Sequence, residues 1–303
     1  MIRPLARGLT LAVLLVASIS FFAARPMSAQ TAPAQPAPAA ESPGSAQGPV
    51  SAELHVLLQA MGIYEVLNIM AAEGLAGAPD LEADLFAGKG GSAWLAMAAS
   101  IYDGDRMVSR FEAAFPAERL SAEQIATLAA FFDSELGQRI AAGETAARRA
   151  FLDTTIEDAA SELAQRRAAD GHPRIAQLTR FIAVNDLVER NVSGALNSNF
   201  AFYRALSDAG AFPAPIPEAM MLAEVWGQEP EIRADTLEWL FGFQTLAYED
   251  LSDADLEAYI AISETPAGQA LNAALFVGFD ALFEAISADL GRAAAGFIAG
   301  EDT

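Results

Sequence analysis

The sequence has 303 residues, a formal net charge of −22 at pH 7 and no cysteine. The lack of cysteine excludes disulfide bonds, a thiolate nucleophile and thioether-linked haem. The excess of acidic residues argues against nucleic acid and anionic membrane surfaces as partners, because both are bound through Lys and Arg. Since 53% of the residues are hydrophobic, the chain has enough apolar material for one large or two ordinary cores.

Residues 1–29 have the pattern of a secretory signal peptide. Arg3 and Arg7 precede an apolar run from Leu9 to Ala24, and Met27-Ser28-Ala29 offers a cleavage site with small residues. The apolar run is shorter than the roughly 20 residues that a helix needs to cross a bilayer. We therefore expect a cleaved signal peptide and an exported, periplasmic protein, with an uncleaved N-terminal anchor as the alternative.

The composition changes twice after the signal peptide. Residues 30–49 are rich in Pro, Ala and Gln and contain almost no bulky apolar side chains, which predicts a disordered linker. From Val50 onward, apolar residues recur at spacings of 3 and 4, and no segment alternates strictly. This periodicity predicts an all-α fold, either a helical bundle or tandem helical domains. We expect no transmembrane segment in the mature chain.

The first folded segment is predicted to contain several helices. One apolar stripe runs from Leu54 to Met70, and the Gly and Pro residues of 74–79 are expected to end that helix. A short helix is predicted at 80–86. A further apolar face runs from Trp94 to Phe115, with a possible interruption at 102–104.

Residues 120–138 are similar to residues 251–269, with five of nineteen positions identical. The identical pairs are Leu120/Leu251, Ser121/Ser252, Ala130/Ala261, Gly137/Gly268 and Gln138/Gln269. Both segments begin with the spacing of a capping box, Ser121 with Gln124 and Ser252 with Asp255. Ser134 and Thr265 are expected to cap a second helix, and Pro266 takes the favoured first helical position.

These similarities predict an internal duplication. Long terminal helices are expected at 137–169 and 268–299. Upstream, residues 57–66 pair with residues 178–187 at an offset of 121 positions, whereas the motif repeats at an offset of 131. We therefore expect about ten additional residues in the second copy, placed within Phe200 to Trp226. With Asp170 to Pro173 as the joint, the predicted units are residues 50–171 and 172–303.

The motif of the first copy resembles a known protein family. The pattern Leu-Ser-x-x, an apolar helix and Phe-Phe-Asp-Ser-x-x-Gly-Gln, which ends at Gln138, is similar to a family of secreted Gram-negative bacterial domains named domain of unknown function twenty fifty-nine. The first copy has Glu135 where the family typically has Pro. The second copy keeps Pro266 but has Ile262 and Ser263 in place of the aromatic residues. The resemblance implies an all-helical exported domain, and it brings no catalytic residue.

No catalytic, metal or cofactor site is predicted from the residues. His55 and His172 are the only histidines, and neither has the neighbours of a nucleophilic triad. There is no His-x-x-x-His spacing and no calcium loop. The acidic residues between Glu249 and Glu257 are interpreted as helix N-terminal carboxylates that complement the helix dipole. We expect that the protein is not an enzyme.

One segment is richer in aromatic residues and methionine than its structural role requires. Its candidate binding residues are Phe202, Tyr203, Phe212, Met220, Met221 and Trp226. They are predicted either to present a patch that binds a partner, to cap an apolar pocket, or simply to close the second bundle. The preferred function is therefore a non-catalytic binding protein of the cell envelope, with another envelope protein as its partner. The alternative is a carrier that holds an apolar small molecule or lipid between amphipathic helices.

Overall fold

The structure is a computed structural model, and it describes residues 50–300. Within this range the regular elements are helices and there is no strand, so the predicted all-α class is confirmed. The predicted signal peptide at 1–29 and linker at 30–49 lie outside the described residues.

The chain forms two consecutive series of helices, which are joined at Asp170 to His172. The first series consists of α2 (Ala52–Ala60), α3 (Ile63–Phe86), α4 (Gly91–Ile101), α5 (Gly104–Ala114), the short 3-10 helix η2 (Ala117–Arg119), α6 (Ala122–Phe132), α7 (Glu135–Ala150) and α8 (Thr154–Ala169). The second series consists of α9 (Pro173–Val184), α10 (Leu187–Asp208), α11 (Glu218–Gly227), α12 (Glu229–Ala247), α13 (Asp253–Glu264) and α14 (Pro266–Ala299). Pro173 begins α9, as the predicted joint requires.

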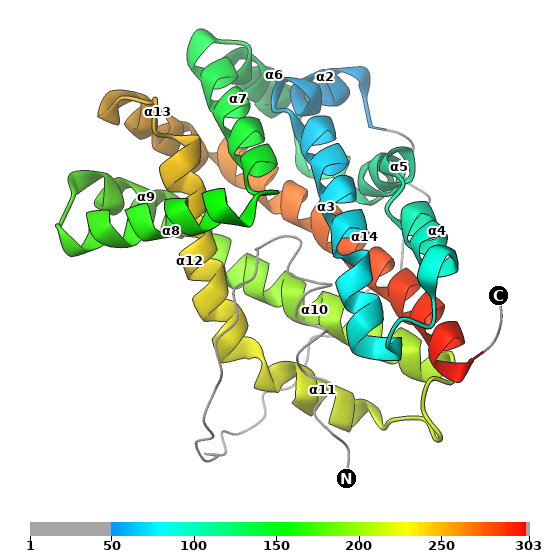
Figure 1. Cartoon of the computed structure of the whole chain (residues 1–303). Coiled ribbons are helices and arrows are strands. Elements are labelled where there is room, and N and C mark those ends of the chain that lie inside the picture. Colours follow the sequence, from blue (N-terminus) through cyan, green and yellow to red (C-terminus); the bar gives the residue numbers. More distant parts are fainter. Residues whose placement is uncertain (1–49, 301–303) are drawn as a thin grey trace.

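The long helix α14 lies at the centre of the molecule (Figure 1). It packs along α10 and also contacts α3, α4, α5 and α6 of the first series. In return, α12 of the second series packs against α7 and α8. Helices of the second series therefore pack against helices of the first series at both places, and the main core contains residues of both series.

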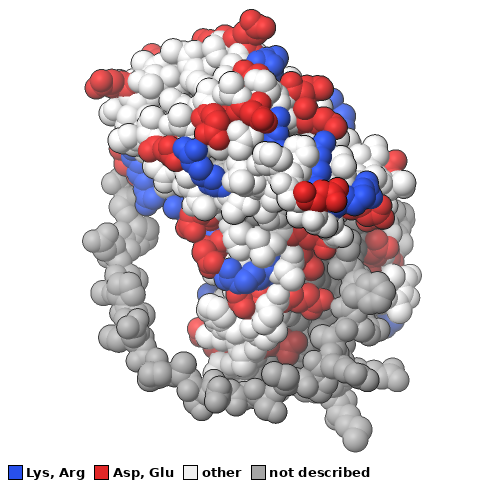
Figure 2. Space-filling model, turned by 90° about the vertical axis from the view of Figure 1, so that its left-hand side faces the viewer, with Lys and Arg blue, Asp and Glu red and all other residues white. Residues whose placement is uncertain are grey.

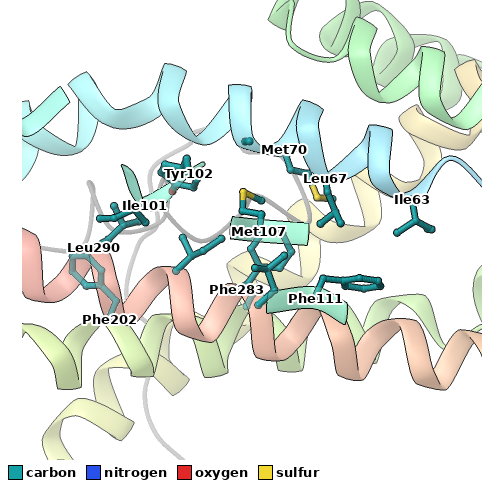
Figure 3. Close-up of a cluster of buried hydrophobic side chains, with 14 of the residues drawn as sticks. Ile63, Leu67, Met70, Ile101, Tyr102, Met107, Phe111, Phe202, Phe283 and Leu290 are labelled. Carbon is teal, nitrogen blue, oxygen red and sulfur yellow. The ribbon is translucent and has the colours of Figure 1, made fainter. Parts of the chain in front are cut away.

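The main core fills the space between α3, α14 and α10 (Figure 3). Phe111 and Phe202 are fully buried there. At the far end of α14, the ring of Phe297 stacks on Phe86 at a centroid distance of 5.2 Å, and Trp94 meets both rings edge-on. Aromatic contacts from three elements therefore fix the C-terminal end of α14 against α3 and α4.

One described helix, α14, is long and apolar enough to cross a membrane by length and composition. Helices α2 and α3 pass the same test only if they are taken together, and they meet at an angle of 63°. A core helix that is packed on several sides passes this test as well, and α14 contacts helices of both series.

The first long helix differs from the prediction at both ends. The apolar stripe of residues 54–70 is divided at Gly62, whose φ of 75° only glycine adopts readily. Helix α3 then continues through Gly74 and Pro79 to Phe86, so the predicted break and separate short helix were wrong. Tertiary packing explains the continuation. A Cβ atom at Gly74 would lie 2.2 Å from the Tyr102 ring, and Trp94 Nε1 donates a hydrogen bond to the Ala78 carbonyl oxygen at 2.6 Å.

The predicted helix at 137–169 was also wrong in its continuity, because α7 ends at Ala150 and α8 begins at Thr154. Asp153 caps α8 by accepting a hydrogen bond from the Thr155 amide at 2.9 Å. An Asp in that role satisfies an amide that would otherwise lack a partner. In the second series, α14 runs unbroken from Pro266 to Ala299, close to the predicted range.

The two similar motifs have the same local geometry. Ser121 and Ser252 both form complete capping boxes. Ser134 and Thr265 both cap the next helix, accepting from the amides of Gly137 at 3.1 Å and Gly268 at 3.0 Å. A Cβ atom at either glycine would lie 2.2 Å from a carbonyl oxygen of the preceding helix. Glycine is therefore required at this turn in both motifs.

Charged side chains of both signs are mixed on the surface. Figure 2 shows one face, on which basic residues lie among acidic ones. Arg180 on α9, for example, reaches Glu257 at 2.7 Å and Glu264 at 2.9 Å on α13. Exposed pairs of this kind contribute little to stability, about 0 to 1 kcal/mol each.

Candidate functional site

A cavity of about 300 Å³ lies between the two helix series, and we call it the central cavity. Its walls come from α3, α6 and α7 on one side and from α9, α10, α12, α13 and α14 on the other. Most lining residues are apolar or aromatic, among them Met70, Phe132, Phe243 and Phe279. Its volume and lining match the small-molecule sites of proteins, which are mostly apolar with a few placed polar groups.

The polar groups of the central cavity gather where α7 meets α12 and α13. Glu144 on α7 accepts hydrogen bonds at Oε1 from the hydroxyl of Tyr248 at 2.6 Å and from that of Tyr259 at 3.1 Å. Burial raises the pKa of Glu144, and the two tyrosine hydroxyls act in the opposite direction. Burial and the nearby Glu144 carboxylate raise the pKa of both tyrosines, so the two phenols stay protonated donors.

Arg148 lies one helical turn after Glu144 on α7 and also lines the central cavity. Only 4% of its side chain is exposed, and it forms an ion pair with Glu73 on α3. Its guanidinium carbon also lies 5.4 Å from the ring centroid of Trp239. Ion pairing and ring stacking therefore hold this cation in the wall of the cavity.

Among the residues of α12 that line the central cavity, two have a buried polar atom without a hydrogen-bond partner within residues 50–300. They are Trp239 Nε1 and Gln244 Oε1. Both residues line the central cavity, and their exposed fractions are 8% and 2%. Buried polar groups are nearly always paired in folded proteins. These two atoms are therefore the donor and acceptor most in need of a ligand.

A second hollow of about 250 Å³ lies between α8 and α12 and shares Trp239 with the central cavity. We call it the acidic pocket. It is lined by Glu157, Asp158, Ser161, Glu162, Asp235, Glu238 and Trp239. Burial, reinforced by neighbouring carboxylates, raises the pKa of Glu157 to about 7 and that of Asp235 to about 6. Within the described residues, no group of His, Cys, Asp and Glu has the arrangement of a metal site.

The six residues predicted as a binding site do not form one cluster. Phe202, Tyr203 and Met221 are buried in the main core, and Phe212 packs against it. Met220 and Trp226, by contrast, are 58% and 63% exposed on α11. None of the six lines the central cavity.

The two histidines have structural neighbours. His55 Nδ1 lies 2.7 Å from the hydroxyl of Tyr64, and that hydroxyl donates to Glu112 at 2.6 Å. His172 caps α9 by accepting a hydrogen bond from the Arg174 amide at 3.2 Å. Neither histidine lines the central cavity or the acidic pocket.

Comparison with known families adds one match. Residues 105–166 match a family described as an uncharacterised protein conserved in bacteria, DUF2059. This stretch is a DUF2059 domain. It is the family of unknown function to which the first motif is similar, and it extends from α5 to α8. The match covers about a fifth of the chain and does not reach the second motif. No curated protein and no solved structure matches the chain.

The DUF2059 domain supplies one polar wall of the central cavity, because Glu144 and Arg148 lie within it. The sequence alone did not single out these two residues, the Glu144 partners Tyr248 and Tyr259, or Gln244. The motif residues predicted the turns between neighbouring helices. The cavity residues, by contrast, lie on helices that are far apart in the sequence. The only signal was the cluster of three aromatic residues in Trp239–Phe243.

Proposed function

We propose that this chain is a non-catalytic binding protein of the cell envelope that holds a small apolar molecule in the central cavity. The observation that carries the proposal is a cavity of about 300 Å³ with apolar walls and a few polar groups on one side. The acidic composition agrees with this proposal, because it disfavours nucleic acid and anionic membranes as ligands.

The cavity is tested by blocking it. Leu275 on α14 lines the central cavity, so Leu275→Trp should fill it. The matched control is Leu237→Trp, because Leu237 on α12 is 38% exposed and lies outside the cavity. The probe is N-phenyl-1-naphthylamine, whose fluorescence rises in apolar sites. We expect saturable binding of one probe per chain in the native protein and in Leu237→Trp, and a loss of at least tenfold in Leu275→Trp. Equal binding by both variants would place the ligand elsewhere.

Export is part of the proposal. The basic start and apolar run of residues 1–29 support it. Mass spectrometry of the protein recovered from the periplasm should give a mature chain that begins at Gln30. A chain that keeps residues 1–29 and stays with the membrane would support the N-terminal anchor.

We also propose that the two helix series arose by duplication, with the central cavity between the copies. The support is the shared geometry of the two motifs and a parallel order of packing. Helix α2 packs on α6 as α9 packs on α13, and α5 packs on α14 as α12 packs on α7. The residues at the α2–α3 and α9–α10 junctions, Gly62 and Asp186, both have positive φ. An experimental structure in which α2–α7 and α9–α14 do not superpose would contradict a duplication.

A second candidate function is the binding of another envelope protein through α11. The observation that favours it is the exposure of Met220, Leu222 and Trp226 on this helix. A photo-crosslinking amino acid at position 226 should capture one defined protein in the periplasm, and the same group at the exposed position 162 on α8 should not. Identical products from both positions would argue against a specific surface on α11.

A further inference from the structure

We propose that the ligand of the central cavity carries a hydrogen-bond donor at its polar end, as an alkyl alcohol or alkyl amine does, and that carboxylates are rejected. This inference rests on the proposed function and specifies its ligand class. The cavity volume of about 300 Å³ lies at the lower end of the range for small-molecule sites, about 300 to 1,000 Å³.

The first argument comes from Glu144. Both tyrosine hydroxyls donate to its Oε1 atom, so neither of these two bonds involves its Oε2 atom. The two hydroxyl donors favour the ionised form of Glu144 against the effect of burial, and an ionised carboxylate only accepts hydrogen bonds. Because Glu144 lines the central cavity, its second oxygen is available to a donor on the ligand.

The second argument comes from α12. Gln244 precedes Tyr248 by one helical turn, so the two residues lie on the same face of the chain. The unpartnered Oε1 atom of Gln244 accepts hydrogen bonds, and the unpartnered Nε1 atom of Trp239 donates. A hydroxyl both donates and accepts, and it therefore satisfies either atom. The amide of Gln244 can also turn over and present either its NH2 group or its oxygen to a ligand. Glu144 is therefore the residue that favours a ligand with a hydrogen-bond donor over a carboxylate.

The third argument is the balance of charge. Arg148 is the cation in this wall, and it is already paired with Glu73. Glu157 is close enough to interact with both Glu73 and Arg148. The carboxylates of Glu73 and Glu157 therefore both interact with one guanidinium, and Glu144 adds a third carboxylate to the lining of the same cavity. A ligand carboxylate would add a further negative charge to a poorly solvated site, where repulsion is strong.

The inference is tested with three ligands of equal chain length, 1-decanol, decylamine and decanoate. Each is used at pH 8 to displace N-phenyl-1-naphthylamine from the full mature protein. We expect decanol and decylamine to bind at least tenfold more tightly than decanoate. Decanoate that binds as tightly as the other two would overturn the inference while leaving the apolar site intact. Failure of the probe and of all three ligands to bind would overturn the proposed function itself, and the inference with it.

The role of Glu144 is tested by Glu144→Gln, which keeps the shape of the side chain and removes its charge. The matched control is Glu135→Gln, because Glu135 is exposed on the same helix and lies outside the cavity. We expect Glu144→Gln to reduce the preference for decylamine over decanoate at least tenfold, and Glu135→Gln to leave it unchanged. An unchanged preference in a folded Glu144→Gln protein would contradict the role of this carboxylate, and the comparison of ligands on the native protein holds even if the variant does not fold.

Discussion

Gly143 on α7 lies directly against the carbonyl oxygen of Ala247 on α12. A Cβ atom built at Gly143 would lie 2.4 Å from that oxygen, well inside van der Waals contact. The next residues in each helix, Glu144 and Tyr248, form the 2.6 Å hydrogen bond at the polar side of the central cavity. The close approach of the two backbones therefore sets the geometry of this site.

Gly143→Ala is expected to destabilise the protein by about 1 to 3 kcal/mol, because the added methyl group meets backbone and not a flexible side chain. The matched control is Gly77→Ala in α3, where a Cβ atom would meet nothing within 4 Å. That substitution should stabilise the protein by about 0.5 to 1 kcal/mol through the higher helix propensity of alanine. Urea denaturation followed by circular dichroism measures both. A Gly143→Ala protein as stable as Gly77→Ala would show that the helices separate without cost.

Tyr248→Phe is expected to lower the free energy of unfolding by about 1.5 to 3 kcal/mol, because it removes a buried hydrogen bond to a carboxylate. Tyr259→Phe should cost less, since its hydroxyl lies 3.1 Å from the same oxygen. Both substitutions should raise the pKa of Glu144 further, because each hydroxyl stabilises its ionised form. Chemical denaturation of the two variants at pH 7 measures which of them loses more unfolding free energy. Greater loss in Tyr259→Phe would mean that the longer bond is the important one.

Stability is expected to depend on pH through Glu157. Burial first, and the Glu73 carboxylate second, raise its pKa from 4.5 to about 7 in the folded protein. The folded state therefore binds this proton more tightly than the unfolded state. The resulting stability is fully present below pH 4.5 and is lost as the pH rises through 7. Asp235, whose pKa is raised to about 6 mainly by burial, acts in the same direction.

The measurement is urea denaturation of the native protein and of Glu157→Gln at pH 5 and pH 7.5. The contribution of Glu157 to the loss should be about 2 kcal/mol, and it should be absent in Glu157→Gln. Glu162→Gln is the control, because Glu162 lines the same pocket but is 70% exposed. If the free energy of unfolding depends on pH in the same way in Glu157→Gln and Glu162→Gln, the pKa of Glu157 is not raised by burial and this prediction is wrong.

Neither predicted unit is expected to fold alone. Residues 50–171 would lose the contacts of α5 and α3 with α14, and residues 172–303 would lose those of α12 with α7 and α8. Mixed together, the two fragments should form a one-to-one complex with native near-ultraviolet circular dichroism. Size-exclusion chromatography checks the complex. A cooperative thermal transition in either isolated fragment would show that the units are independent domains.

The sequence by itself determined the helical class and the local starts and stops of helices. Ser121, Ser252 and Thr265 cap helices where their spacing predicts, because a capping bond joins residues only three positions apart. Pro173 likewise begins α9, since proline favours a first helical turn.

Only the tertiary structure decided which helices continue and where the cavity lies. Gly74 and Pro79 remain inside α3 because Tyr102 and Trp94 pack there, and this packing outweighs local propensity. The polar side of the cavity joins Glu144 to Tyr248, which are 104 positions apart. No periodicity within a single segment connects two such residues. Their contact arises from the crossing of α7 and α12, which burial of both helices imposes.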